Sequence, residues 1–132
     1  NGGIDIQVLG LGLNGHIGFN EPGVSQNSVT RKVALSDTTR EAAAKYFEGK
    51  EKVPYEAVSM GIKTILDAEH IVLMAWGNEK AEIVKKSIEG RISEDVPSTF
   101  LQEHENVTII LDSESASLLN RSRVSLIESK LS

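Results

Sequence analysis

Residues 71–75 form a short run that is apolar at every position, and this run most constrains how the chain can fold. Apolar side chains on both faces of a strand are typical of a parallel sheet covered on both sides. Residues 107–111 form a second buried strand, and residues 4–9 alternate apolar and polar side chains as a third. Segments with helical apolar spacing lie between them. We therefore predict an α/β fold, a three-layer sandwich with a mostly parallel, Rossmann-like sheet.

Further elements are expected between these strands. A strand over 29–35 leads through Ser36 and Asp37, both helix-capping residue types, into a helix over 38–47. Helices are also expected over 55–66, 79–89 and 114–119, and residues 121–132 are expected to be a tail. The 132 residues are within the size of a single domain. The chain starts at Asn1 without an initiator Met or a targeting pattern, so we expect a piece of a longer protein.

Composition narrows the classes of partner. The formal net charge of −5 argues against a nucleic-acid or membrane partner, because phosphate backbones and anionic lipids attract basic surfaces. No apolar run approaches the roughly 20 residues that span a bilayer. The chain has no Cys, which excludes disulfides and cysteine-ligated zinc and is compatible with the cytoplasm. We expect a cytoplasmic protein whose partner is a small molecule.

A glycine-rich stretch, residues 10–18, follows the first predicted strand. Ligands of open parallel sheets bind beyond the carboxyl ends of the strands, which favours this stretch as a site. We expect Gly10 and Gly12 to adopt positive φ and to let the backbone approach a ligand closely. A tight turn without any ligand explains such a Gly-x-Gly about as well.

His16 is the candidate acid/base group in this stretch. Its ordinary pKa suits proton transfer near neutral pH, although a surface histidine without a role is an equally good reading of its position alone. Asn14 and Glu21 lie close to it in the sequence. One could fix the tautomer of the imidazole while the other stabilises its charged form.

Residues 12–22, Gly-Leu-Asn-Gly-His-Ile-Gly-Phe-Asn-Glu-Pro, resemble the signature of the glucosamine-6-phosphate deaminases. The similarity continues through 30–31, 37–40, 53–54, 60–68, 77–80, 101–102 and 104. The resemblance implies the C-terminal portion of a single sugar-phosphate isomerase/deaminase domain. The implied reaction converts glucosamine 6-phosphate and water to fructose 6-phosphate and ammonia by aldose–ketose isomerisation and deamination. The resemblance implies no metal and no organic cofactor.

The same resemblance implies roles for particular residues. His16 would be the acid/base group for the ring oxygen and the anomeric hydroxyl, supported by Glu21 and Asn14. Many relatives carry Asp in place of Asn14, and an amide keeps the orienting role but supplies no charge. Lys80 resembles the lysine that grips the substrate phosphate, and Lys45 falls where relatives have a phosphate-binding arginine.

Two parts of the family pattern are absent from this sequence. The aspartate that moves the proton between C2 and C1, and a Ser-Gly-Gly phosphate loop, belong to the N-terminal half of relatives, so we expect this chain alone to be inactive. Some relatives are hexamers activated by N-acetylglucosamine 6-phosphate. Here Arg31 fits the effector site, but Val24 and Val33 replace a hydroxyl and a basic residue, so we expect no such control. A homo-oligomer is compatible with the sequence.

Three other functions compete. A 6-phosphogluconolactonase-like hydrolase has a related glycine–histidine loop, but Asn20-Glu21-Pro22 favours the deaminase. A noncatalytic sugar-phosphate-binding module is suggested by the missing aspartate. A dinucleotide-binding domain fits the glycine spacing, but Pro22-Gly23 breaks the helix that should follow.

Overall fold

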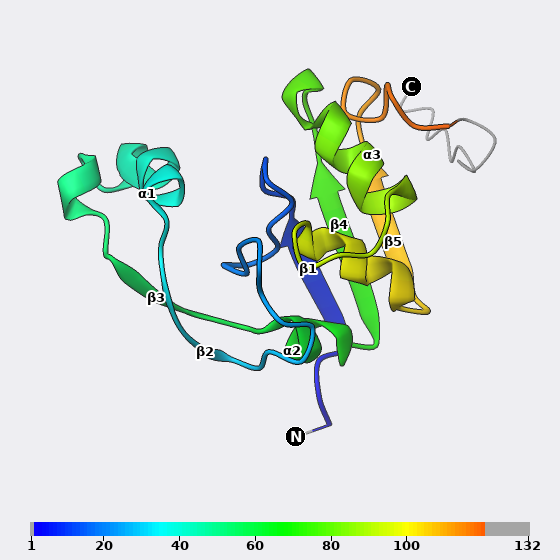
Figure 1. Ribbon diagram of the computed structural model, residues 1–132, viewed down its shortest axis with the longest axis horizontal. Coiled ribbons are helices and arrows are strands. Elements are labelled where there is room, and N and C mark those ends of the chain that lie inside the picture. The colour runs from blue at the N-terminus through cyan, green and yellow to red at the C-terminus, as the bar shows by residue number, and fades with distance from the viewer. Residues whose placement is uncertain (1, 121–132) are drawn as a thin grey trace.

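The computed structural model describes residues 2–120 and contains a three-stranded parallel sheet (Figure 1). Its strands are β1 (Ile6–Gly10), β4 (His70–Ala75) and β5 (Val107–Leu111), in the order β1-β4-β5. Both pairings are parallel, so each connection crosses over the sheet. The predicted α/β class, the parallel sheet and its three strands are confirmed. The expected tail, 121–132, lies outside the described residues.

One face of the sheet carries the hydrophobic core. The parallel register sets Leu9 beside Leu73 and Leu73 beside Ile109, so their side chains share a face. Helices α2 (Ile62–Leu66), α3 (Ala81–Glu89) and η4 (Pro97–Glu103) supply the apolar side chains that cover this face. The core members fully or nearly fully removed from solvent include Ile17, Ile62, Ile65, Ile71, Leu73 and Val84.

The opposite face of the sheet is open. Ile6, Val8 and Ile110 lie on it and are 61%, 53% and 51% exposed. Residues 2–120 therefore form two of the three predicted layers, the sheet and the helices on one face. Among residues 2–120, none of the helices has the length and apolar character that a membrane-spanning segment requires.

A second, antiparallel sheet carries a helical unit away from the core. β2 (Arg31–Ala34) pairs with β3 (Glu56–Ser59), and α1 (Asp37–Ala43) with the turns η1 (Ala44–Tyr46) and η2 (Lys50–Lys52) lies at the far end of this ribbon (Figure 1). The strand predicted over 29–35 is confirmed for residues 31–34. The helix predicted over 38–47 is confirmed as far as Ala43, after which the chain continues as the 3-10 turn η1.

The helix predicted over 55–66 is wrong in its first half. Residues 56–59 pair with β2 as the strand β3, and only Ile62–Leu66 are helical. The apolar spacing fitted a helix because Val58 counted as a buried position, yet its side chain is 73% exposed. Gly61 separates the strand β3 from the helix α2. A β-carbon on Gly61 would lie 2.2 Å from the Ser28 carbonyl oxygen.

The helix predicted over 114–119 is replaced by turns. The hydroxyl of Ser115 donates to the Ala75 carbonyl (3.0 Å), and the carboxylate of Asp112 accepts from the Ser115 backbone N–H (2.8 Å). Such side-chain bonds to the backbone compete with helical hydrogen bonding. The helix predicted over 79–89 begins as the 3-10 turn η3 (Asn78–Lys80) and continues as α3.

Candidate active site

The glycine-rich loop after β1 folds into a tight turn that presents His16. The Gly12 N–H donates to the His16 carbonyl (3.0 Å), and the Gly15 N–H donates to the Gly12 carbonyl (2.9 Å). Ile17 is fully buried and anchors the loop in the core. The Asn20 side chain is also fully buried and donates to the carbonyls of Ile17 (2.9 Å) and Met60 (2.8 Å). His16 therefore projects from a well-supported loop at the carboxyl end of β1.

Gly12 is required for a reason that differs from the predicted one. Neither Gly10 nor Gly12 has a positive φ, so that expectation is wrong. A β-carbon on Gly12 would lie 2.2 Å from Nδ1 and Cε1 of His16, whereas one on Gly10 would meet nothing within 4 Å. The missing side chain of Gly12 makes room for the imidazole ring.

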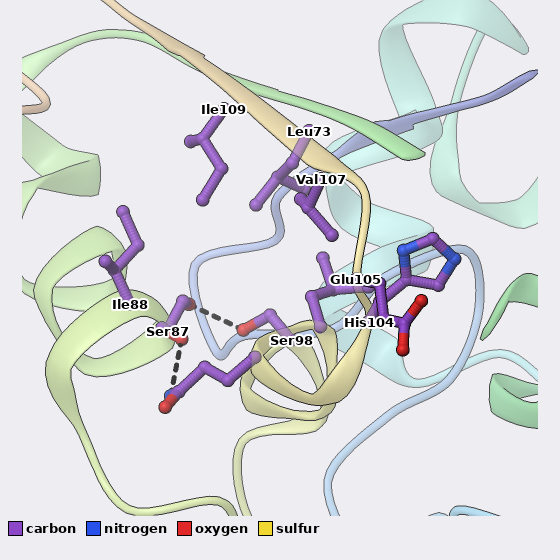
Figure 2. Close-up of a pocket in the computed structure, with 10 residues that line it drawn as sticks. Leu73, Ser87, Ile88, Ser98, His104, Glu105, Val107 and Ile109 are labelled. Atoms are coloured by element: carbon purple, nitrogen blue, oxygen red, sulfur yellow. Dashed lines mark hydrogen bonds between the residues drawn. The ribbon is translucent and has the colours of Figure 1, made fainter. Parts of the chain in front are cut away.

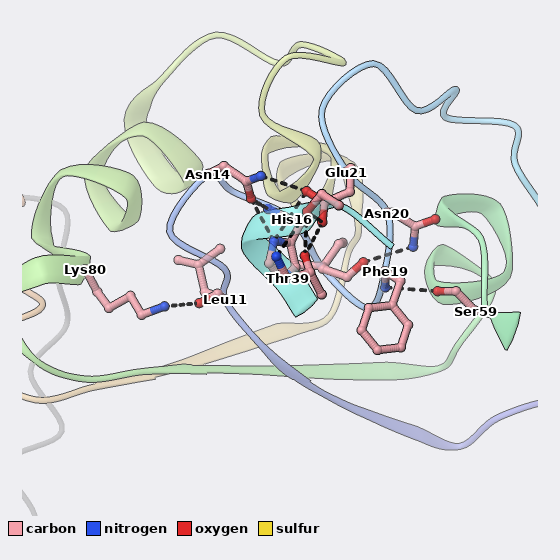
Figure 3. A network of polar contacts seen from close by, with 11 residues as sticks. Leu11, Asn14, His16, Phe19, Asn20, Glu21, Thr39, Ser59 and Lys80 are labelled. Carbon is pink, nitrogen blue, oxygen red and sulfur yellow. Dashed lines mark hydrogen bonds and ion pairs between the residues drawn. The ribbon is translucent and has the colours of Figure 1, made fainter. Parts of the chain in front are cut away.

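The three predicted polar residues form one connected array (Figure 3). His16 Nδ1 lies 2.7 Å from Asn14 Oδ1, and Asn14 Nδ2 donates to Glu21 Oε2 at 2.7 Å. His16 Nδ1 is also 3.7 Å from Glu21 Oε2. The Asn14 amide thus bridges the imidazole and the carboxylate.

This array determines which ring nitrogen of His16 carries the proton. An ionised carboxylate only accepts hydrogen bonds, so Glu21 must face the amide NH₂ of Asn14. The amide oxygen then faces His16 Nδ1, and an oxygen that only accepts requires Nδ1 to be the donor. In the neutral imidazole, Nε2 is left with its lone pair available to a ligand.

The pKa of His16 is lowered from its ordinary value. Burial is the main cause and the charge of Lys80 adds to it, while the charge of Glu21 acts in the opposite direction. The pKa of Glu21 is also lowered. Burial of its side chain favours the neutral form, but hydrogen bonds from Thr39, Asn14 and Ser36 and the charge of His16 outweigh it. A neutral imidazole therefore faces an ionised carboxylate near pH 7.

The second oxygen of Glu21 binds α1. Glu21 Oε1 accepts from Thr39 Oγ1 at 2.7 Å and from Ser36 Oγ at 3.4 Å. The sequence predicted Ser36 as a helix cap, which is confirmed by its bond from the Thr39 N–H (3.1 Å). It did not single out the side chain of Thr39, because no pattern connects a residue of α1 to the loop after β1.

His16 and Lys80 line the same cavity, which has a volume of about 640 Å³. Lys80 Nζ donates to the Leu11 carbonyl at 2.6 Å, which holds the ammonium group at the loop (Figure 3). Helix α1 closes the other side. The residues that line the cavity are Gly10, Leu11, Gly12, Leu13, Asn14, His16, Gly18, Phe19, Thr38, Thr39, Ala42 and Lys80.

Lys45 is not brought to this cavity. It lies in η1, and its Nζ stands 4.9 Å from the centre of the Tyr46 ring. Of the predicted substrate-binding residues, the structure brings Gly10, Gly12 and Lys80 together and leaves Lys45 apart.

A second cavity, of about 400 Å³, lies against β5 and η4 (Figure 2). Its polar groups bind one another: Ser87 and Ser98 share a hydrogen bond of 2.6 Å, and Gln102 donates to the Ser87 carbonyl at 2.9 Å. His104 bonds the Ala68 carbonyl through Nε2 (2.7 Å) and accepts the Asn106 N–H through Nδ1 (3.0 Å). These groups stabilise the packing of η4, and the first cavity is the better candidate site.

Residues 2–120 contain no group of three or more His, Cys, Asp or Glu side chains that could hold a metal ion. The titratable groups of the first cavity are an imidazole and an ammonium group, with the Glu21 carboxylate behind the imidazole. Such a set suits acid/base chemistry on an anionic substrate.

Comparison with known proteins finds close relatives. Residues 1–110 match the family described as glucosamine-6-phosphate isomerases/6-phosphogluconolactonase. The chain is 56% identical over 116 residues to a glucosamine-6-phosphate deaminase of Listeria monocytogenes, covering 88% of this chain and 50% of that protein. It is 52% identical over 120 residues to a protein of the same name from Rhodopirellula baltica, covering 91% and 48%.

Solved structures agree with this similarity. A monomeric glucosamine-6-phosphate deaminase superimposes with a TM-score of 0.83 at 52% identity, covering 87% of this chain and 48% of that one. The 6-phosphogluconolactonase of Trypanosoma cruzi superimposes with a TM-score of 0.68 at 27% identity, covering 89% and 42%. The chain spans about half the length of the curated relatives that it matches.

Proposed function

This chain belongs to the family of glucosamine-6-phosphate isomerases and 6-phosphogluconolactonases, and from that premise we propose that the full-length protein converts glucosamine 6-phosphate and water to fructose 6-phosphate and ammonia. Relatives of that name are 56% and 52% identical to it. The observation that carries the proposal is the His16 imidazole, held by Asn14 and Glu21 in a cavity that also contains Lys80.

His16 would open the pyranose ring. Its Nε2 lone pair accepts the proton of the anomeric hydroxyl as the C1=O bond forms and the bond from C1 to the ring oxygen breaks. The same nitrogen then donates that proton to the ring oxygen, so atoms and charge balance. A lowered pKa supports this role, because the imidazole must be neutral to accept the first proton.

Lys80 would bind the substrate phosphate. Its ammonium group is tethered to the Leu11 carbonyl, and Lys80 lines the cavity together with residues of α1. A lysine acts on phosphate as a point charge, and the backbone amides at the start of α3 lie next to it in sequence.

The later proton transfer from C2 to C1 needs a base that this cavity does not supply. None of the described residues that line it is an aspartate or a glutamate, and Glu21 stands behind the imidazole with both oxygens bound. We propose that the base comes from the part of the protein outside this chain.

The proposed substrate also bears on where in the cell the protein acts. We propose a cytoplasmic location, because a sugar phosphate carries charge that an apolar bilayer excludes and it therefore stays in the aqueous compartment where it is formed. A homo-oligomer remains a prediction from the sequence.

An assay of the full-length protein tests the proposal. Incubation with glucosamine 6-phosphate should release ammonia and fructose 6-phosphate in equal amounts, and His16→Gln should lower kcat about 10²- to 10⁴-fold, the usual contribution of a general acid/base. 6-Phosphogluconolactone serves as the rival substrate. Preferential hydrolysis of the lactone would favour the lactonase, and binding of glucosamine 6-phosphate without turnover would favour a noncatalytic binding module.

A further inference from the structure

The two carboxylate oxygens of Glu21 bind different parts of the molecule. Oε2 faces the loop after β1, where it accepts from Asn14 and lies 3.7 Å from His16. Oε1 faces α1, where it accepts from Thr39 at 2.7 Å. The carboxylate is therefore held between two elements that are separated in the sequence by the strand β2.

The hydroxyl groups of Ser36 and Thr39, on the α1 side, form a chain of hydrogen bonds that runs in one direction and ends at the Glu21 carboxylate. The Thr39 N–H donates to Ser36 Oγ at 3.1 Å, Ser36 Oγ donates to Thr39 Oγ1 at 2.9 Å, and Thr39 Oγ1 donates to Glu21 Oε1. Each hydroxyl has a single proton. The Ser36 proton is directed to Thr39 Oγ1 at 2.9 Å in preference to the longer contact with Glu21 Oε1 at 3.4 Å, and in this order each proton is used once. Hydrogen bonds connected in this way polarise one another, and the last bond, to a carboxylate, is charge-assisted.

Capping of α1 does not account for the Thr39 hydroxyl. The cap bond runs from the Thr39 backbone to Ser36 Oγ and needs no hydroxyl on residue 39. The bond from Thr39 Oγ1 reaches across to Glu21, 18 residues earlier in the sequence. Its effect falls on the carboxylate.

We propose that Thr39, oriented by Ser36, is a positioning residue that fixes the Glu21 carboxylate behind Asn14 and His16, so that the placement of α1 is part of the working site. The proposal rests on the proposed function for its kinetic consequences. In this proposal both hydroxyls act through Glu21, whose Oε1 accepts the hydrogen bond from Thr39.

The protonation of Glu21 depends on the same contacts. Burial of its side chain raises the pKa, and the hydrogen bonds from Thr39 and Asn14 are the strongest influences that lower it. The other titratable groups whose charges act on this array within residues 2–120 are His16 on the loop and Lys80 at η3. Loss of the Thr39 hydroxyl should raise the pKa of Glu21 and leave these two groups in place.

Thr39→Val in the full-length protein tests the inference, with Thr39→Ser as the matched control. Valine has the shape of threonine without the hydroxyl and keeps the backbone cap bond, whereas serine keeps the hydroxyl. We expect Thr39→Val to lose about tenfold in kcat with a smaller change in KM, as for a lost charge-assisted hydrogen bond. The acidic limb of its pH–rate profile should move to higher pH. Thr39→Ser should restore both properties.

A second measurement does not depend on turnover. Carbon-13 NMR titration of the Glu21 carboxyl in the full-length wild type and variants should show a higher pKa in Thr39→Val than in Thr39→Ser. A wild type that releases no ammonia would refute the proposed function while the titration still decides the role of Thr39. Equal titration of Glu21 in all three folded proteins, or equal damage by serine and valine, would overturn the inference.

Discussion

Asn14 has an amide where many relatives carry a carboxylate, so its side chain orients the His16 imidazole without supplying a charge. It accepts from His16 Nδ1 and donates to Glu21, so it transmits the position of the carboxylate to the imidazole without adding a charge of its own. Glu21 is the acid of this array, and at 3.7 Å its charge still raises the pKa of His16 against the effect of burial. The balance between these two influences sets the protonation of the candidate acid/base group.

Glu21→Gln should lower the pKa of His16 further. The substitution removes the charge that favours imidazolium and leaves burial and Lys80, which both favour the neutral ring. NMR titration of the His16 ring in the full-length protein measures this directly, with the resonances of His70 and His104 as internal controls. A limb of the pH–rate profile that reports the His16 ring should move to lower pH. A higher or unchanged pKa would contradict the assigned electrostatics.

Gly12→Ala should displace the imidazole without straining the backbone. The added β-carbon would stand 2.2 Å from two ring atoms of His16, and Gly12 does not have a positive φ. We expect kcat to fall by about 10²-fold, the typical effect of a reacting group misplaced by 1 Å, with little change in unfolding free energy. The NMR resonances of the His16 ring should shift in Gly12→Ala and stay in place in Gly10→Ala. An unmoved ring in Gly12→Ala would refute the packing argument.

Arg40 holds together the helical unit at the far end of the ribbon. The residue is only 5% exposed, and its guanidinium donates to the carbonyls of Lys50 (3.0 Å) and Val53 (3.2 Å) and stacks 3.8 Å from the centre of the Tyr55 ring. The guanidinium thus joins α1 to η2 and to the start of β3. Because α1 carries Thr39, this unit also sets the distance between Thr39 and Glu21.

Arg40→Ala should destabilise this unit by about 2 to 4 kcal/mol, because it leaves buried carbonyls without their donor. Denaturant unfolding of the full-length protein measures the loss. Arg91→Ala is the control, since Arg91 is exposed and such substitutions typically change stability by less than about 0.5 kcal/mol. A change for Arg40→Ala as small as that of the control would show that α1 is held by other contacts.

Residues 2–120 leave one face of the sheet uncovered and lack an acidic side chain in the cavity. Ile6, Val8 and Ile110 are exposed on the sheet, and the cavity is lined by no aspartate or glutamate. We predict that the purified 132-residue chain releases no ammonia from glucosamine 6-phosphate, while the full-length protein does. Circular dichroism of both proteins controls for folding. Turnover by the chain at a rate comparable to that of the full-length protein would refute the prediction.

We also predict that the full-length enzyme shows hyperbolic kinetics and no activation by N-acetylglucosamine 6-phosphate. Val24 packs against the core and Val33 lies in β2, so neither position offers a hydroxyl or a cation to an effector phosphate. Arg31 donates to Asn20 Oδ1 at 2.9 Å and is thereby engaged within the chain. Initial rates with and without the effector measure this. A sigmoidal curve that the effector makes hyperbolic would contradict it.

The sequence alone identified the site residues that are close together in the chain. Asn14, His16 and Glu21 lie within one loop, so a short-range pattern was enough to predict that they meet. The parallel strands could also be predicted, because the pattern of apolar residues within each strand indicates its burial without reference to other segments. The strand β3 was misassigned because Val58 is apolar but 73% exposed, and only pairing with β2 decides its structure.

Long-range contacts complete that loop, and no local pattern predicted them. The contact between Glu21 and Thr39 depends on how the ribbon of β2 and β3 places α1, and the shared cavity of His16 and Lys80 depends on the pairing of β1 with β4. The Nδ1–H tautomer of His16 follows from the direction of the Asn14 amide, which the Glu21 carboxylate determines. Contacts between distant parts of a chain depend on the packing of whole elements, and a local sequence pattern carries no information about that packing.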